Sequence, residues 1–165
     1  MLIKIHEAIE KICPIYGVSD DGNGKFIINY RNESTAEQQA AAQEILNQWP
    51  LISAKETKLE QIESEWKQLE ATGWDCGQGH LGITANDVAL LSGCHALGKE
   101  ADALGLPIPS IVTMENNEIT FTTMAQFTQL MLQYGAYRAH LSSTFAARRR
   151  AVAATTTLEE LESIP

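Results

Sequence analysis

Hydrophobic positions in the first fifty residues predict a small unit of helix, strand and helix. Isoleucines recur at helical spacing over residues 2–13, and the pattern stops before Pro14. The apolar segment KFIINY follows the turn-forming cluster SDDGNG and predicts one strand. Ser34 and Glu37 have the spacing of a capping box, so a helix is expected from there to Trp49-Pro50. These elements define an expected first domain at residues 1–52.

Three longer helical patterns follow, in an expected second domain of residues 53–165. The first covers residues 56–71, where apolar residues recur in steps of 3 and 4. The second begins at Thr84, with Asp87 as its capping partner. One face of this helix carries an apolar stripe made of Leu90, Cys94, Leu97, Ala101 and Leu104.

The third pattern is a heptad seam that begins near Thr123 and is interrupted by two arginines. We expect Trp66, Trp74 and Leu90 to share a core with this long helix, because each lies on or beside an apolar stripe that needs a partner. The seam consists of Met124, Phe127, Met131, Tyr134, Arg138, Leu141, Phe145, Arg148 and Val152.

Two shorter elements complete the expected second domain. Alternating residues on both sides of Asn116-Asn117 predict a β-hairpin, since asparagine tolerates the positive φ of a tight turn. Thr156 and Glu159 form another capping box, which predicts a terminal helix over LEELESI. The expected fold class is therefore α+β and helix-dominated, with a small N-terminal α-β-α unit followed by a helical bundle with one β-hairpin.

Composition and charge exclude several classes of partner. The 165 residues carry a formal net charge of −9, which argues against a general nucleic-acid binder and against adhesion to anionic lipid.

The three cysteines are an odd, sparse set rather than a disulfide framework, which indicates a reducing compartment. Charged residues interrupt the N-terminal apolar run, so no signal peptide is expected. The longest uncharged run, Ile119–Tyr137, is rich in threonine and glutamine and does not predict a membrane span.

The segment Gly77-Gln78-Gly79-His80-Leu81-Gly82 matches the G-x-G-x-x-G pattern of dinucleotide-binding loops. Such a loop needs a strand before it and an acidic residue at the end of the next strand. Here a helical pattern precedes the motif, and Asp102, at the appropriate distance, lies within another helical pattern. We therefore expect no nucleotide cofactor and interpret the segment as a structural turn. Its expected contributors are Trp74, as an apolar anchor, and Gly77, Gly79 and Gly82.

Cysteine and histidine near this turn raise the question of metal binding or catalysis. Cys76 and His80, with Cys94-His95 further along, have the right donor atoms for zinc but not the spacing of a structural zinc site. Cys76 with His80, His95 or His140 would make a nucleophile pair, but no third orienting group is evident. We expect no metal and no catalytic residues. A small cytoplasmic enzyme that uses the Cys76/His80 region stays an alternative.

Several segments of the chain resemble a domain of unknown function found in phage and prophage tail proteins, where it is associated with tail fibres. The matching features are the opening GWDCGQG, then DVALL, GLPIPSIV, LMLQYGAYRA and the alanine-rich helix followed by TTLEEL. The first half, with ICPIYGVS and TAEQQAAAQEILNQW, resembles the small N-terminal module that accompanies such domains. The resemblance implies a structural or assembly role without catalysis, other tail proteins as partners, and a place in the virion or in the host cytoplasm during assembly. A partner-binding adaptor unrelated to phage is a further alternative.

The far end of the long helix is the expected interaction surface. Its seam mixes apolar residues with an arginine, and the shorter helices before it can cover only part of its length. We therefore expect self-association through residues 141–164, with acidic residues of a second copy facing the arginine. The run Arg148–Arg150 is otherwise interpreted as a solvated stretch near a helix end. The expected surface consists of Phe145, Arg148, Val152, Glu159 and Glu160.

Overall fold

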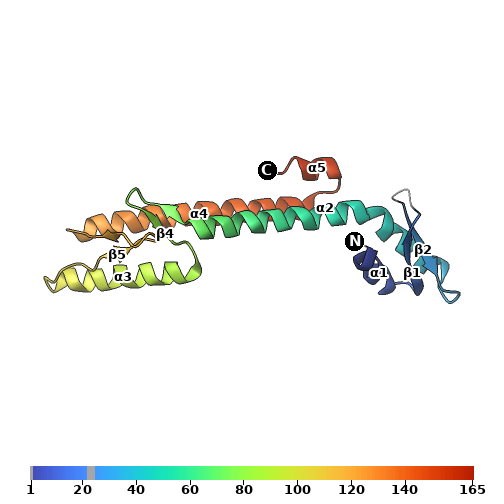
Figure 1. Ribbon diagram of the computed structural model, residues 1–165, viewed down its shortest axis with the longest axis horizontal. Helices are drawn as coiled ribbons and strands as arrows, with labels where there is room; N and C mark the ends of the chain where they lie inside the picture. The colour runs from blue at the N-terminus through green and yellow to red at the C-terminus, as the bar shows by residue number, and fades with distance from the viewer. Residues whose placement is uncertain (1, 22–24) are drawn as a thin grey trace. The chain divides into compact units, whose positions relative to one another are not determined.

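The computed structural model describes residues 2–21 and 25–165, which fold as two compact units. Unit 1 consists of Met1–Thr57 and Thr155–Ser163, and unit 2 of Lys58–Ala154 and Ile164–Pro165. The described residues form five helices and three two-stranded antiparallel hairpins, so the predicted α+β, helix-dominated class is confirmed (Figure 1). The expected domain boundary after residue 52 lies inside a helix.

Unit 1 is built on one β-hairpin rather than the single strand that was predicted. Helix α1 (Leu2–Glu10) packs on β1 (Ile15–Asp20), which pairs with β2 (Phe26–Tyr30). The sequence pattern missed β1 because a β-bulge between Ile15 and Gly17 interrupts its alternation. The predicted turn SDDGNG lies partly outside the described residues. The buried core of the unit consists of Ile5, Ile9, Cys13, Ile15, Ile28, Ala42, Leu46 and Trp49.

Helix α2 (Ala36–Thr72) continues through Pro50, so the predicted end at Trp49-Pro50 is wrong. Proline lacks one backbone donor and usually breaks a helix at a cost of about 3 kcal/mol. Trp49 is buried in the core of unit 1 and Ile52 packs against the same cluster. Both contacts require helical spacing across the proline, and their burial offsets the lost hydrogen bond.

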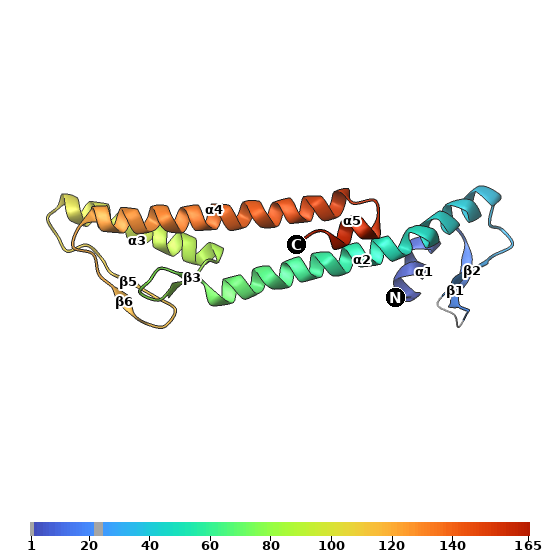
Figure 2. The same cartoon turned by 90° about the horizontal axis from the view of Figure 1, so that it is seen from above.

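Unit 2 combines the second part of α2 with α3 (Ala85–Ala103) and α4 (Met124–Ala154). Figures 1 and 2 show α3 and residues 58–72 of α2 both running alongside α4. Two hairpins connect these helices: β3 (Trp74–Asp75) with β4 (His80–Leu81), and β5 (Ile111–Val112) with β6 (Glu118–Ile119). The second was predicted, and Asn116 adopts the positive φ of 62° that its turn requires. The first was not predicted, because each of its strands has only two residues.

The seam predicted on α4 is confirmed over its whole length, since every member is buried or half-buried. Its two arginines have partners within the chain. Arg138 donates through Nη1 to the carbonyl oxygens of Ile83 and Thr84. Arg148 pairs with the carboxylate of Glu65 and donates through Nε to the carbonyl of Pro165 at 2.7 Å. Both interruptions of the heptad pattern are therefore sites where α4 fixes other parts of unit 2.

The stripe predicted on α3 includes leucines that face outward. Leu90, Leu97 and Leu104 are 67%, 64% and 71% exposed, so the expected place of Leu90 in the core is wrong. Leu91 and Gly98 are buried instead. Glycine permits the close approach at that face, because a Cβ on residue 98 would lie 3.0 Å from the Met124 sulfur and 3.4 Å from the Phe127 ring.

The three predicted capping boxes differ in accuracy. Thr84 and Asp87 form the box that begins α3, as predicted. The other two are displaced by one residue: Thr35 with Gln38 begins α2, and Thr157 with Glu160 begins α5 (Leu158–Glu162). In both cases adjacent hydroxyl residues compete for the cap, and the sequence alone does not separate them.

Candidate functional site

The glycine motif forms a turn within an antiparallel hairpin. Gly77 and Gly79 connect β3 to β4 with φ values of 83° and 133°, which favour glycine. Gly82 has a different reason, since a Cβ there would lie 2.4 Å from the Asp87 carboxyl group. The motif therefore runs through strand β4 and lacks the strand–loop–helix geometry that holds a dinucleotide.

Trp74 fixes the first strand of this hairpin to α4. Its ring lies 5.9 Å from the ring of Tyr134 and 6.0 Å from that of Tyr137, in stacked or tilted arrangements. The Tyr134 hydroxyl donates to the carbonyl of Gly82 at 2.8 Å, close to the start of α3. The hairpin is thus attached to α4 by Trp74, before the glycine motif, and by Gly82 at the end of the motif, as an aromatic anchor in this position predicts.

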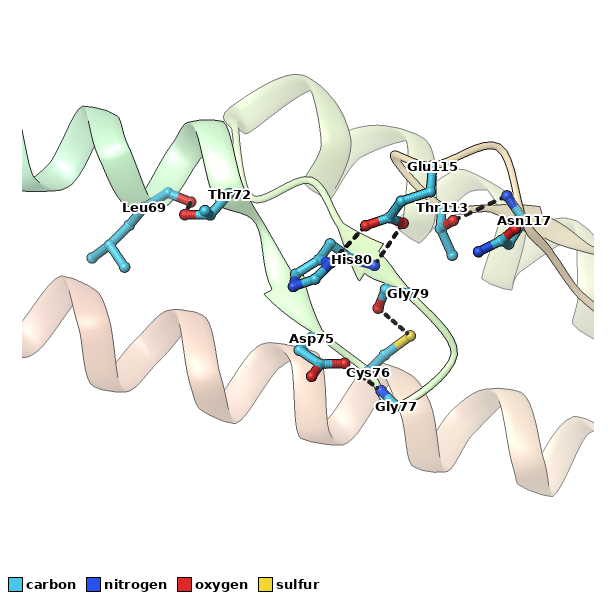
Figure 3. A network of polar contacts seen from close by, with 10 residues as sticks. All are labelled: Leu69, Thr72, Asp75, Cys76, Gly77, Gly79, His80, Thr113, Glu115 and Asn117. Atoms are coloured by element: carbon cyan, nitrogen blue, oxygen red, sulfur yellow. Dashed lines mark hydrogen bonds and ion pairs between the residues drawn. The ribbon is translucent and has the colours of Figure 1, made fainter.

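Side chains around the turn form a network of polar contacts (Figure 3). The Cys76 thiol donates to the carbonyl of Gly79 at 3.1 Å, and the amide of Gly77 donates to Asp75 Oδ1 at 2.8 Å. His80 interacts with Glu115 twice: its backbone amide donates to Oε2 at 2.9 Å, and its Nδ1 lies 2.6 Å from Oε1. Because Glu115 belongs to the turn between β5 and β6, these contacts connect the two hairpins of unit 2.

The network favours the ionised form of Glu115. Hydrogen bonds from the His80 amide and then from the His80 ring lower the pKa of this carboxyl group from 4.5 to about 2, with further contributions from its own amide and from Thr113. A third connection between the hairpins comes from the backbone, where the amide of Met114 donates to the carbonyl of His80 at 2.8 Å. Glu115 was not singled out in the sequence, because its role depends on a contact 35 residues away.

The cysteines and histidines are engaged separately. In Figure 3 the Cys76 sulfur points toward Gly79, whereas the His80 ring points toward Glu115. His95 Nε2 lies 3.0 Å from the Thr128 hydroxyl, which couples α3 to α4. Among the residues that the structure describes, no group of three metal-ligating side chains comes together. The Cys76 thiol and the His80 ring therefore have structural partners rather than one another.

A pocket of about 270 Å³ lies beside the turn, and its wall is largely polar. Four glutamines contribute to its wall, so it offers uncharged donors and acceptors that suit a neutral polar group such as a peptide amide. Cys76 also lines it, with its thiol already bonded to Gly79. The lining residues are Cys76, Gln78, Ile119, Thr120, Phe121, Gln126, Gln129, Leu130 and Gln133.

The predicted interaction surface at residues 141–164 requires a correction. Phe145 is 5% exposed and Val152 is fully buried within the chain, so neither is free to meet a partner. The Phe145 ring packs edge-on against Trp66 at 5.2 Å. Arg148 finds its carboxylate in Glu65 of the same chain, which removes the reason for a neighbouring copy to supply one.

The acidic members of that surface differ from each other. Glu160 accepts from the backbone amide of Thr156 at 2.7 Å, and this contact and the Thr156 hydroxyl lower the pKa of its carboxyl group. Its role is to cap α5, a local function that a capping-box pattern displaced by one residue would have revealed. Glu159 is exposed in the first turn of α5.

Leucines of the apolar stripe predicted on α3 lie at the surface, although the sequence pattern predicted them as part of a core. We name Leu90, Leu97 and Leu104 the leucine ridge. The repeat of seven residues was visible in the sequence, but the exposure of its leucines was not, because α3 has a second apolar face.

None of the helices in the described part of the chain is both long and apolar enough to cross a membrane.

Comparisons of the chain with protein-family models, with curated proteins and with solved structures return no match.

Proposed function

We propose that the chain is a non-enzymatic structural or assembly component of a phage or prophage tail, with other tail proteins as its partners. The observation that carries the proposal is the resemblance of the segment that opens with GWDCGQG and ends with the alanine-rich helix. It acts in the virion, or in the host cytoplasm while tails assemble. Its work is to bind proteins rather than to transform a substrate.

The geometry of the glycine segment supports a role without catalysis. Nucleophilic catalysis by a thiol requires a base within hydrogen-bond reach of the sulfur. Here the thiol of Cys76 is bonded to a backbone carbonyl, and the imidazole of His80 is bonded to Glu115. The Cys76 thiol is engaged within its own hairpin, and the His80 ring connects that hairpin to the turn between β5 and β6.

The exposed surface of unit 2 supports a protein-binding role. Large apolar side chains in a row on a helix are typical of contact surfaces between proteins. The leucine ridge has this character, and the pocket beside the turn adds uncharged amide groups that suit a peptide backbone. These surfaces are matched to protein partners better than to phosphate or nucleic acid, in line with the net charge of −9.

The test is to delete the gene in the host that carries it, induce particle formation and examine the particles by electron microscopy. We expect particles with missing or defective tails or tail fibres, restored by the wild-type chain supplied in trans. Mass spectrometry of purified particles then separates the two roles, since a structural component is present in the virion and an assembly factor is absent. Fully infectious particles with normal tails in the deletion strain would refute the proposal.

A matched variant separates this proposal from the enzyme alternative. Cys76→Ala removes the thiol from a half-buried position, and a non-catalytic chain carrying it is expected to restore tails as well as the wild type does. A folded Cys76→Ala protein that fails to restore them would favour chemistry at the thiol. Circular dichroism of the purified variant provides the folding control.

A further inference from the structure

The pocket beside the turn has an apolar floor and a polar rim. Ile119 is buried, and Phe121 and Leu130 are half-buried, so these three side chains form the floor. The Phe121 ring is stacked on Phe127 with ring centroids 4.2 Å apart, which fixes its position. The exposed members of the lining stand around this floor, and the glutamines are among them. The pocket therefore offers space for an apolar group that is surrounded by amide groups.

Three of the glutamines lie along one face of α4. Gln126, Gln129 and Gln133 are separated by steps of 3 and 4, and Gln78 contributes from the turn between β3 and β4. Gln126 uses its carbonyl oxygen to accept from the amide of Thr122 at 2.9 Å. In the part of the chain that the structure describes, the side chains of the other three glutamines make no hydrogen bond. Their amides, each with two N–H donors and one carbonyl acceptor, are therefore available to a ligand.

The chemistry of the lining selects an uncharged ligand that carries both donors and acceptors. Among the described residues that line the pocket there is no aspartate, glutamate, lysine, arginine or histidine. A charged group that entered it would lose water without gaining an ion pair. A purely apolar group would cover the glutamine amides and leave them unpaired, at a cost in free energy. A peptide backbone meets both conditions, because most residues present one N–H donor and one carbonyl acceptor.

The spacing of the glutamines matches an extended peptide. From Gln126 to Gln133 the helix rises roughly 10.5 Å at 1.5 Å per residue. Three residues of an extended chain span about the same length, at roughly 3.3 Å per residue. The pocket volume of about 270 Å³ lies below the roughly 300–1,000 Å³ of sites for drug-sized ligands, so it suits one side chain rather than a whole molecule. A segment of three residues can thus place its central side chain on the floor and its backbone beside the glutamines.

We propose that this pocket binds an extended peptide segment of a partner protein, with one aliphatic side chain such as leucine on the apolar floor. The backbone amides on either side of that side chain pair with Gln78, Gln129 and Gln133. Such a segment gains affinity from its main-chain hydrogen bonds and specificity from the side chain in the pocket. The inference rests on the proposed protein-binding function and deepens it by naming the kind of segment that the partner presents.

The first experiment titrates the isotope-labelled full chain with the blocked tripeptide acetyl-Gly-Leu-Gly-amide and follows the side-chain amide signals of the glutamines by NMR. The signals of Gln78, Gln129 and Gln133 should shift together, with a dissociation constant of about 0.1–10 mM for a ligand of this size. The signal of Gln61, an exposed glutamine of α2 outside the pocket, should stay in place. Unchanged signals of the pocket glutamines at about 20 mM peptide would overturn the proposal.

Two modified peptides separate the contributions of the backbone and of the side chain. The same tripeptide with N-methylated amides keeps the leucine but lacks the N–H donors, and it should bind about tenfold more weakly or worse. Acetyl-Gly-Glu-Gly-amide keeps the backbone but brings a charge to the apolar floor, and it should also bind more weakly. If either peptide binds as tightly as the leucine peptide, the assignment of backbone to rim and side chain to floor is wrong.

Variants of the chain test the glutamines themselves. Gln129→Ala combined with Gln133→Ala removes two amides, and alanine preserves the helix. The double variant should bind the leucine peptide about tenfold more weakly, because two hydrogen bonds to neutral groups are lost. Gln61→Ala is the matched control and should bind like the wild type, and circular dichroism checks that both proteins are folded. Wild-type affinity in the double variant contradicts the proposal.

The outcomes of these titrations are distinct from the test of the tail function. Absence of peptide binding to the purified chain, together with defective tails in the deletion strain, would refute the peptide site and leave the tail function standing. Normal tails in the deletion strain, together with peptide binding that depends on the glutamines, would refute the tail function and leave the peptide site standing.

Discussion

Helices α3 and α4 carry apolar stripes that obey the same spacing rule, yet one stripe is buried and the other is largely exposed. Every position of the α4 seam is buried or half-buried, whereas Leu90 and Leu97 on α3 and Leu104 at its C-cap face outward. The difference arises because only one of the two apolar faces of α3 can pack against α4. Helix α3 has two apolar faces, and the one that contains Gly98 fits closer to Met124 and Phe127. An apolar stripe therefore predicts the need for a partner and not which partner meets it.

Alanine substitution at the centre of each stripe should give the largest difference in the free energy of unfolding between the two stripes. Phe127 is fully buried and stacks on Phe121 with ring centroids 4.2 Å apart. Phe127→Ala should lower the free energy of unfolding by about 3–5 kcal/mol. Leu97→Ala, measured in denaturant at a concentration where the chain is monomeric, should change it by less than about 0.5 kcal/mol. Similar losses for both variants would mean that Leu97 is covered within the chain.

Arg138, one of the two arginines within the α4 seam, should show the next largest effect. Arg138 holds the start of α3 on α4 through the carbonyls of Ile83 and Thr84. Arg138→Met keeps the aliphatic stem and removes the charged donor, which should cost about 1–2 kcal/mol of the free energy of unfolding. Arg150→Met, an exposed arginine of the same helix, is the control and should be near neutral. Equal losses from both variants would argue for a general effect of charge on α4.

Removal of the α3 cap should have a smaller effect on the same attachment. The Thr84 side chain accepts from the amide of Asp87, and the Asp87 carboxylate accepts from the Thr84 amide at 2.9 Å. Thr84→Ala should lower the free energy of unfolding by about 1 kcal/mol, and Thr84→Ser should retain most of it. Thermal unfolding followed by circular dichroism distinguishes the two. An alanine variant as stable as the serine variant would show that α3 is held by packing alone.

The smallest effect is expected at the connection between the hairpins, and it should depend on pH. The pKa of Glu115 is lowered to about 2 in the folded chain, so its ionised form stabilises the fold above about pH 4.5, the unfolded value. That contribution is lost as the pH falls from 4.5 toward 2. Glu115→Gln should therefore be less stable than the wild type at pH 7, and the two should converge near pH 2 in urea titrations. If the difference in stability between the two proteins stays constant down to pH 2, the Glu115 carboxylate is not its cause.

Much of the local structure follows from the sequence through contacts between near neighbours. The cap at Thr84, the turn at Asn116 and the seam of α4 each depend on residues within one or two turns of each other. The continuation of α2 through Pro50 does not, because it depends on the shared burial of Trp49 and Ile52 in unit 1. Strand β1 likewise depends on its partner β2 for its existence.

The candidate site divides in the same way. The glycine spacing predicted a turn, and the φ values of Gly77 and Gly79 are those of such a turn. The partner of His80 was not predictable, since Glu115 lies 35 residues away in another hairpin. The partner of Arg148 was expected in a second copy and is Glu65 of the same chain, 83 residues distant. For Arg148 the residue type indicated that a charged partner was needed, but in both cases spacing carried no information about the identity of the partner.

The sequence by itself determined the helix-dominated class, the extent of α4, the start of α3 and the glycine turn. Each of these depends on periodicity, capping or backbone preference, and these act between residues close in the chain. Only the tertiary structure decided which face of α3 is buried, how Arg138 and Arg148 are satisfied, and that Glu115 joins two hairpins. Those outcomes depend on which surfaces approach most closely, and a glycine at position 98 brought one face of α3 against α4 and left the leucine ridge outside.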